Sequence, residues 1–142
     1  MPRVGAMTIS LRYCHITVND PDESLAFYRD ALGLEVRNDV GSGGMRWVTL
    51  GSPDQPELEI VLSAPSAGRS QADADALQEL LTKGVLSMVV FGTDDVDSLF
   101  EKVRASGAEV LQEPVDQAWG PRDCAFRDPS GNMVRINQTP KA

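Results

Sequence analysis

The sequence predicts an α+β fold built from two copies of a βαβββ module. The first observation is the order of the apolar patterns, in which a strand, an amphipathic helix and three more strands occur twice within 142 residues. The second is an internal correspondence, because Arg122 and Pro129 fall 76 positions after Arg46 and Pro53. Two copies are too few for a solenoid, so a duplicated module that folds as one unit fits better.

The spacing between the two halves drifts along the chain. Gly107 falls 74 positions after Gly33, and Met88–Val90 falls 72 positions after Ile16–Val18. Two small insertions explain this drift. We expect one domain overall, made of a first module at residues 8–62, a linker with a short helix at 63–84, and a second module at 85–138.

The first module reads in order as follows. Residues Ile9–Val18 are rich in β-branched side chains and predict a strand. Asp20 can cap a helix with Pro21 in its first position. The helix then carries one apolar face and ends at Gly33. The apolar face of the helix is made by Leu25, Tyr28 and Leu32. Three strands are expected to follow, at Leu34–Arg37, Arg46–Leu50 and Glu57–Leu62. Turns separate these strands at Gly41–Gly44 and Ser52–Pro56.

The second half repeats this order after a linker in which Leu77, Leu80 and Leu81 lie at helical spacing. Asp94 or Asp95 can cap the second module's helix, and Gly107 ends it. The helix face is made by Val96, Leu99, Phe100 and Val103, and the strands are expected at Leu86–Phe91, Glu109–Gln112, Asp123–Arg127 and Met133–Asn137.

The motif Asp128-Pro129-Ser130-Gly131-Asn132 joins the last two strands. Proline fixes φ near −65° and disfavours helix in the residue before it. Gly131 and Asn132 both tolerate positive φ, so the motif predicts a tight hairpin.

Composition limits the classes of partner. The net charge of −8 argues against binding to nucleic acid, which needs a basic face. No segment approaches the ~18 apolar residues of a membrane span, and the N-terminus lacks the apolar core of a signal peptide, so we expect a cytoplasmic protein. The two cysteines, Cys14 and Cys124, have neither disulfide nor zinc spacing and are expected to be small buried residues.

The segments CHITVNDPDESLAFYRDALGLEV and CAFRDPSGNMVRINQ, at residues 14–36 and 124–138, resemble the vicinal oxygen chelate superfamily. This superfamily includes glyoxalase I, bleomycin-resistance proteins and extradiol dioxygenases. The resemblance covers roughly residues 9–138 and implies paired βαβββ modules that curl as a mixed sheet around a cleft and usually form a homodimer. It says little about the reaction, because the superfamily contains lyases, epimerases, dioxygenases, transferases and drug-binding proteins.

In catalytic members, the resemblance implies four strand positions that converge on one divalent ion. The two in the first module match His15 and Glu59, which are good ligands for nickel, zinc, manganese or iron. The repeat offsets place Ser87 and Arg135 at the other two. Serine is a poor ligand, and an arginine is always cationic and has no lone pair to donate. The pattern therefore favours a cleft without a catalytic metal.

Two roles are open for Arg135. It could pair with Glu59 across the cleft and stabilise the fold, or its guanidinium could bind a carboxylate, enolate or phosphate group of a ligand. His15, the only histidine, is the one candidate for acid–base chemistry near neutral pH, although a single strand histidine is often simply packed. The remaining candidates for ligand contact are Ser87, Trp47, Trp119 and Arg122, and Trp119 lies in a loop.

Two function hypotheses follow. In the first, the protein binds a small organic molecule, anionic or aromatic, in its cleft, as a binding protein or a metal-independent enzyme. In the second, it is a metal-dependent lyase of the glyoxalase I kind or a dioxygenase that uses His15 and Glu59, with replacement ligands from a second chain.

Overall fold

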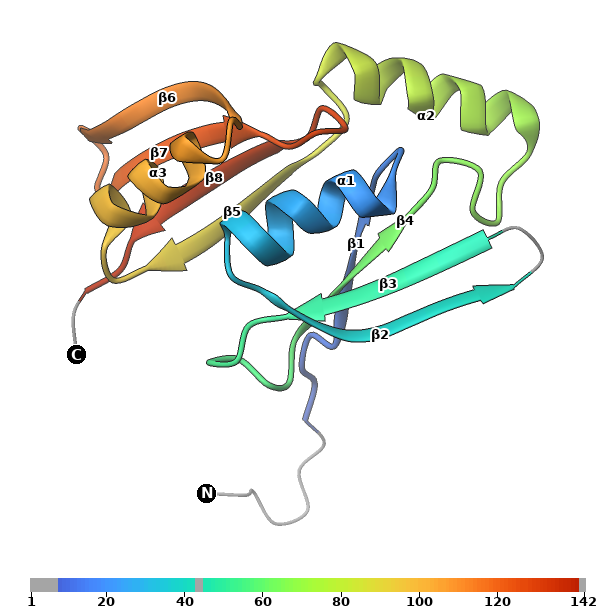
Figure 1. The fold of residues 1–142 in the computed structure, drawn as a ribbon, viewed down its shortest axis with the longest axis horizontal. Coiled ribbons are helices and arrows are strands. Elements are labelled where there is room, and N and C mark those ends of the chain that lie inside the picture. Colours follow the sequence, from blue (N-terminus) through green and yellow to red (C-terminus); the bar gives the residue numbers. More distant parts are fainter. Residues whose placement is uncertain (1–7, 43–44, 141–142) are drawn as a thin grey trace.

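The computed structural model describes residues 8–42 and 45–140, which form two four-stranded sheets and three α-helices (Figure 1). The first sheet has the order β1-β4-β3-β2 and the second the order β5-β8-β7-β6. The strands are β1 (Tyr13–Thr17), β2 (Glu35–Ser42), β3 (Met45–Gly51), β4 (Glu59–Ser63), β5 (Met88–Thr93), β6 (Glu109–Asp116), β7 (Arg122–Arg127) and β8 (Met133–Gln138).

Each sheet is mixed in the same way. Its first and last strands in chain order, β1 with β4 and β5 with β8, run parallel, and the other neighbours run antiparallel. The predicted α+β class and the two βαβββ modules are confirmed. The curled mixed sheet consists of two four-stranded sheets, one in each module, because the described strands pair only within their own sheet.

The helices begin where the capping residues predict. α1 (Pro21–Leu25) starts after Asp20, whose carboxylate accepts from the backbone N–H groups of Asp22 and Glu23. Its last turns, η1 (Ala26–Ala31), are wound as a π-helix, which the apolar spacing did not predict. α3 (Val96–Ala105) is capped by Asp95, whose side chain accepts from the backbone N–H of Ser98.

The linker contains a longer helix than the three leucines suggested. α2 (Gln71–Lys83) starts at the cap residue Ser70 and ends at Gly84, which has a φ of +76°. Positive φ is favourable for glycine, so Gly84 closes the helix without strain. No helix among the described residues is long and apolar enough to cross a membrane, and the expected cytoplasmic location stays a prediction.

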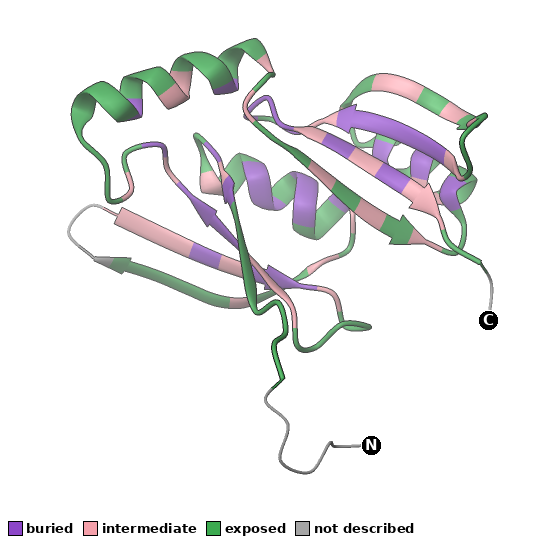
Figure 2. Ribbon diagram, turned by 180° about the vertical axis from the view of Figure 1, so that it is seen from behind, coloured by how far each residue is buried: buried purple, intermediate pink, exposed green. Residues whose placement is uncertain are grey.

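The two helices α1 and α3 cover the same side of the two sheets. They lie in front of the strands in Figure 1 and behind them in Figure 2. The covered faces supply one buried cluster from both halves, which includes Ile16, Leu50, Phe100, Phe126 and Ile136. Because strand residues alternate between faces, the intervening side chains lie on the uncovered side of each sheet, which we call its open face.

The prediction that both cysteines are buried is confirmed for Cys124 and wrong for Cys14. Cys124 is fully buried, and burial, with a further contribution from the charge of Asp123, raises the pKa of its thiol to about 11. Cys14 is exposed instead, on β1, which is the edge strand of the first sheet.

The hairpin motif also connects the two modules. Asp128, buried in the turn, accepts hydrogen bonds from the hydroxyl of Tyr28 and from three backbone N–H groups of its own turn. The side chain of Asn132 donates to the backbone oxygen of Thr17, and the hydroxyl of Ser130 accepts from the backbone of Asn19. Gly131 has a φ of +119°, but Asn132 does not adopt positive φ, and its role is this contact between modules.

The strand registers correct the offsets of the repeat. Val48 pairs with Leu62 in the first sheet, and Cys124 pairs with Ile136 at the equivalent place in the second sheet. The offset is therefore 76 positions from β3 to β7 but 74 positions from β4 to β8. The physical reason is that the loop between β3 and β4 is two residues longer than the turn between β7 and β8. The equivalent of Glu59 is therefore Met133, and the equivalent of Arg135 is Val61.

Candidate functional site

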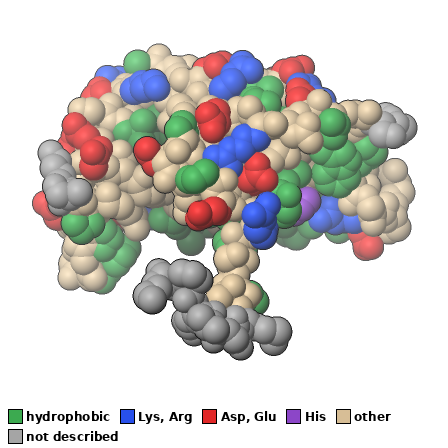
Figure 3. Space-filling model, turned by 90° about the horizontal axis from the view of Figure 1, so that it is seen from below, with side chains coloured by type: hydrophobic (Ala, Val, Ile, Leu, Met, Phe, Trp, Pro, Cys, Tyr) green, Lys and Arg blue, Asp and Glu red, His purple; other side chains and the backbone are tan. Residues whose placement is uncertain are grey.

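The open face of the first sheet carries the histidine. His15 lies opposite Val61 in the register, and Glu59 lies opposite Tyr13, so all four side chains point to the open face. The ring of His15 meets that of Trp47 edge-on, with 6.2 Å between the ring centroids. Figure 3 shows the histidine side chain exposed beside apolar and basic neighbours. This face therefore offers an accessible aromatic surface.

Glu59 is engaged by an arginine of its own module. Its carboxylate lies 3.6 Å from Nη1 of Arg37, and both side chains are largely buried. Arg37 also donates to the backbone oxygens of Ser52, Pro56 and Leu58. The arginine thus holds the loop between β3 and β4 in place, and Glu59 neutralises it.

The open face of the second sheet carries Arg135 over a buried carboxylate. Asp123 on β7 has no exposed surface, and one of its oxygens accepts from Nε and Nη2 of Arg135 at 3.2 and 2.7 Å. Its other oxygen accepts from the side-chain amides of Gln112 and Gln117 at 2.9 and 2.8 Å. Burial alone would raise the pKa of Asp123, but these hydrogen bonds and the charge of Arg135 outweigh it and hold the pKa below its usual value.

The predicted pairing of Arg135 with Glu59 is therefore wrong. Arg135 pairs with Asp123, and Glu59 pairs with Arg37. Each ion pair stays within one module because the partners are neighbours on the same sheet face. Four residues of these clusters were not identified from the sequence: Asp123, Gln112, Gln117 and Arg37. A signal was available for Asp123, because alternation along β7 puts it on the same face as Ala125, the residue opposite Arg135.

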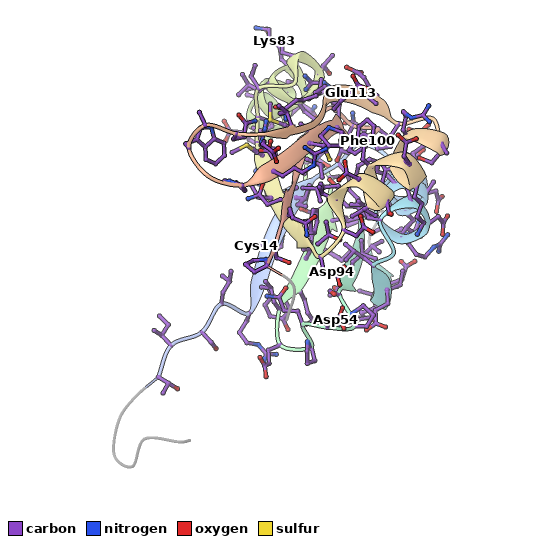
Figure 4. All side chains as sticks on the ribbon, turned by 90° about the vertical axis from the view of Figure 1, so that its left-hand side faces the viewer. Cys14, Asp54, Lys83, Asp94, Phe100 and Glu113 are labelled. Atoms are coloured by element: carbon purple, nitrogen blue, oxygen red, sulfur yellow. The ribbon has the colours of Figure 1, made fainter. Side chains whose placement is uncertain are left out.

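Two other predicted site residues lie away from Arg135. Ser87 precedes β5, and its hydroxyl donates to the side chain of Asn132, so it is not on the open face and does not occupy the place equivalent to His15. Arg122 pairs with Asp97 of α3 on the helix-covered face, where it lines a hollow of about 280 Å³ with Phe100 and Glu113. Figure 4 shows Phe100 on α3 and Glu113 on β6.

Trp119 is 69% exposed in the loop between β6 and β7, and nothing in its surroundings tests its predicted ligand contact.

A larger groove, of about 730 Å³, lies between the two modules. Its lining includes the side chains of Cys14, Ile60, Val89, Phe91 and Leu99, and Asp54 is among the polar lining residues. His15, Glu59 and Arg135 do not line it. Figure 4 shows Cys14 on β1 and Asp54 on the loop between β3 and β4. The groove therefore borders the open face of the second sheet at Val90 but is lined by none of the predicted site residues.

The donor set that residues 8–42 and 45–140 provide does not fit a divalent metal ion. Among the described residues, no three side chains of His, Cys, Asp or Glu lie close enough together to hold one. His15 and Glu59 share a face, but the carboxylate is paired with Arg37, and the residue opposite His15 is Val61. A metal centre of three or more such ligands would need donors from outside these residues.

Comparisons with known proteins point to one family. The model of the family described as "Glyoxalase/Bleomycin resistance protein/Dioxygenase superfamily" matches residues 10–136. The crystal structure of UcmS2 is similar with a TM-score of 0.82 and 33% identity, over 94% of this chain and all of that one. TnmS3, an antibiotic binding protein from Streptomyces sp. CB03234, has the same fold with a TM-score of 0.73 and 24% identity, over 95% of this chain and all of that one.

A curated relative is an enzyme by name. The "probable lactoylglutathione lyase" of Synechocystis sp. is 29% identical over 132 residues, which cover 91% of this chain and 95% of the relative. Similarity therefore extends both to a binding protein and to a predicted lyase.

Proposed function

The chain belongs to the glyoxalase/bleomycin resistance protein/dioxygenase superfamily, and from this premise we propose that it binds a small, partly aromatic organic molecule on its open faces without a catalytic metal. The observation that carries the proposal is the pair formed by His15 and Trp47, two aromatic rings in contact on an exposed strand face that the helices leave uncovered. Aromatic rings at an accessible surface are suited to stacking against a flat ligand.

The second sheet supports the same proposal. Its open face presents Met88 and Val90, which are 59% and 49% exposed, beside Arg135. Thioether and aliphatic side chains make favourable contacts with aromatic rings. The similarity to TnmS3, itself an antibiotic binding protein, agrees with a role in binding rather than in turnover.

A binding experiment tests the proposal. Planar aromatic compounds are screened by equilibrium dialysis against the wild-type protein and against the variants Trp47→Ala and Trp119→Ala. We expect Trp47→Ala to weaken binding of the compounds that the wild type retains by about tenfold, the effect of losing one stacking partner. Retention of no compound, or equal dissociation constants for wild type and Trp47→Ala, would refute the proposal.

A metal-dependent lyase or dioxygenase that uses His15 and Glu59 is the second candidate. The lyase arm is favoured by the similarity to the probable lactoylglutathione lyase. Elemental analysis of protein purified without a histidine tag or chelator distinguishes the candidates. About one nickel, zinc, manganese or iron ion per chain would favour the enzyme, and glyoxalase and dioxygenase assays would follow.

We also propose that two chains form a homodimer. Among the described strands, the edge strands β1 and β5 each have one unpaired side, and apolar side chains along them are exposed, including Tyr13, Met88 and Val90. Exposed apolar edges pair readily with another strand. Light scattering should therefore give twice the chain mass of 15.4 kDa.

A further inference from the structure

We propose that Arg135 binds an uncharged carbonyl oxygen of a planar apolar ligand rather than an anion, and that Asp123 and Gln112 are the residues that position its guanidinium. This inference rests on the proposed binding function and names the ligand class for the second sheet.

The first step concerns the donors of Arg135. A guanidinium carries five N–H groups. The single N–H of Nε and one of Nη2 point to Asp123, and Nη2 also donates to the side-chain oxygen of Gln112 at 2.9 Å. The side of the guanidinium that would bind a carboxylate with two parallel hydrogen bonds is therefore already used inside the protein.

The second step concerns the remaining donors of Arg135, the N–H groups of Nη1. The two N–H groups of Nη1 have one contact among the described residues, the sulfur of Met133 at 4.0 Å, and sulfur is a weak acceptor. The arginine side chain as a whole is 20% exposed on the open face. The two N–H bonds of one nitrogen diverge, so a single carbonyl oxygen accepts from one of them.

The third step is electrostatic. Asp123 lies 2.7 Å from Nη2, is fully buried and is held ionised by its hydrogen bonds, so the cluster has no net charge. An anion at Nη1 would be attracted by the guanidinium and repelled by the carboxylate behind it. The net charge of −8 adds to the repulsion. A neutral acceptor gains the hydrogen bond without this repulsion.

The fourth step is the apolar surface around Nη1. Met133 neighbours Arg135 on the same face of β8, and Met88 and Val90 lie opposite these two residues on β5. These three side chains offer contact to a flat hydrocarbon ring and no counter-charge. The ligand part bound here is therefore a planar apolar ring system with a carbonyl group at its edge.

Matched probes test the inference. Fluorene, 9-fluorenone and 9-fluorenone-2-carboxylate share one planar skeleton, and xanthene, xanthone and xanthone-2-carboxylate provide a second set. Their dissociation constants are measured by equilibrium dialysis at two salt concentrations. For the wild type we expect each neutral ketone to bind about tenfold tighter than its parent hydrocarbon, the effect of one hydrogen bond from a charged donor, and tighter than its carboxylate.

Arg135→Lys is the decisive variant, because lysine can keep the ion pair with Asp123 but lacks the Nη1 group. We expect the preference for the ketone to fall to about twofold or less. Arg122→Lys is the matched control, an arginine paired with an aspartate on the opposite face of the same sheet, and it should keep the wild-type preference.

The outcomes separate this inference from the proposed function. Three outcomes would overturn the carbonyl inference while the binding function stands. The wild type could bind ketone and hydrocarbon equally, or the preference for the ketone could survive in Arg135→Lys. The third outcome is that the carboxylates bind tightest, with strong salt dependence. Binding of none of the six probes by the wild type would overturn both.

The positioning role has its own readout. In Gln112→Ala, Arg135 keeps Asp123 but loses the side-chain oxygen that fixes Nη2. We expect the ketone preference to shrink while the hydrocarbon's dissociation constant stays unchanged. A merely structural role for Gln112 would weaken both probes equally and would overturn this part of the inference.

Discussion

The hydroxyl of Tyr28, on the helix of the first module, donates a hydrogen bond of 2.6 Å to the carboxylate of Asp128, in the last turn of the second module, and both residues are buried. Asp128 also accepts from the side-chain amide of Asn132, which in turn reaches the backbone of Thr17. The turn motif is therefore a contact between modules as well as a hairpin, and it fixes the end of β1 against the start of β8.

Tyr28→Phe should destabilise the protein by about 1.5–3 kcal/mol, the range for hydrogen bonds to charged groups. Burial, and then the charge of Asp128, raise the pKa of Tyr28 above its usual value, so the hydroxyl is a donor at every pH below the alkaline range. Urea unfolding followed by circular dichroism measures the loss. Tyr13→Phe, at an exposed tyrosine, should change stability by less than about 0.5 kcal/mol. Equal effects of the two substitutions would contradict the role of this bond.

Ser24→Ala should stabilise the protein by about 1 kcal/mol, because burying a hydroxyl without a partner is unfavourable. Ser24 is fully buried in α1, and among the described residues its hydroxyl has no hydrogen-bond partner. The matched control is Ser130→Ala, because that hydroxyl accepts from the backbone of Asn19 and its removal should be destabilising. Thermal unfolding of both variants decides, and a lower melting temperature for Ser24→Ala would show that the hydroxyl has an unrecognised partner.

Local chemistry predicted the elements well and the site poorly. Rules that act over a few residues predict the helix cap at Asp20, the helix cap at Asp94 or Asp95, and the turn at Asp128–Asn132. The structure has a cap at Asp20, a cap at Asp95 and a turn at Asp128–Asn132. The partners of Arg135 depend on strand register instead. A loop longer by two residues in the first module shifts the equivalence of β4 and β8, and a fixed offset cannot detect this.

The carboxylate of Asp123 should make stability depend on acid pH. Its folded pKa is lowered, so its contribution is present above its pKa in the unfolded chain, near 4, and is lost as the pH falls through the folded value. The double variant Asp123→Leu with Arg135→Met removes this titration and leaves no buried unpaired charge. Below about pH 4 we expect its free energy of unfolding to fall less steeply with pH than that of the wild type. Parallel pH profiles would mean that folding does not lower the pKa of Asp123.

Val90→Lys should dissociate the proposed homodimer. Val90 is 49% exposed in the middle of β5, whose free edge is unpaired among the described strands and borders the groove between the modules. A lysine on an edge strand opposes pairing with another strand, because its charge would have to leave water. Light scattering over a dilution series should show a dissociation constant raised by at least about tenfold, corresponding to ~1.4 kcal/mol. Leu80→Lys on the exposed side of α2 is the control and should leave the mass unchanged. If Leu80→Lys dissociates the dimer and Val90→Lys does not, the interface lies on the linker helix and the edge of β5 is free.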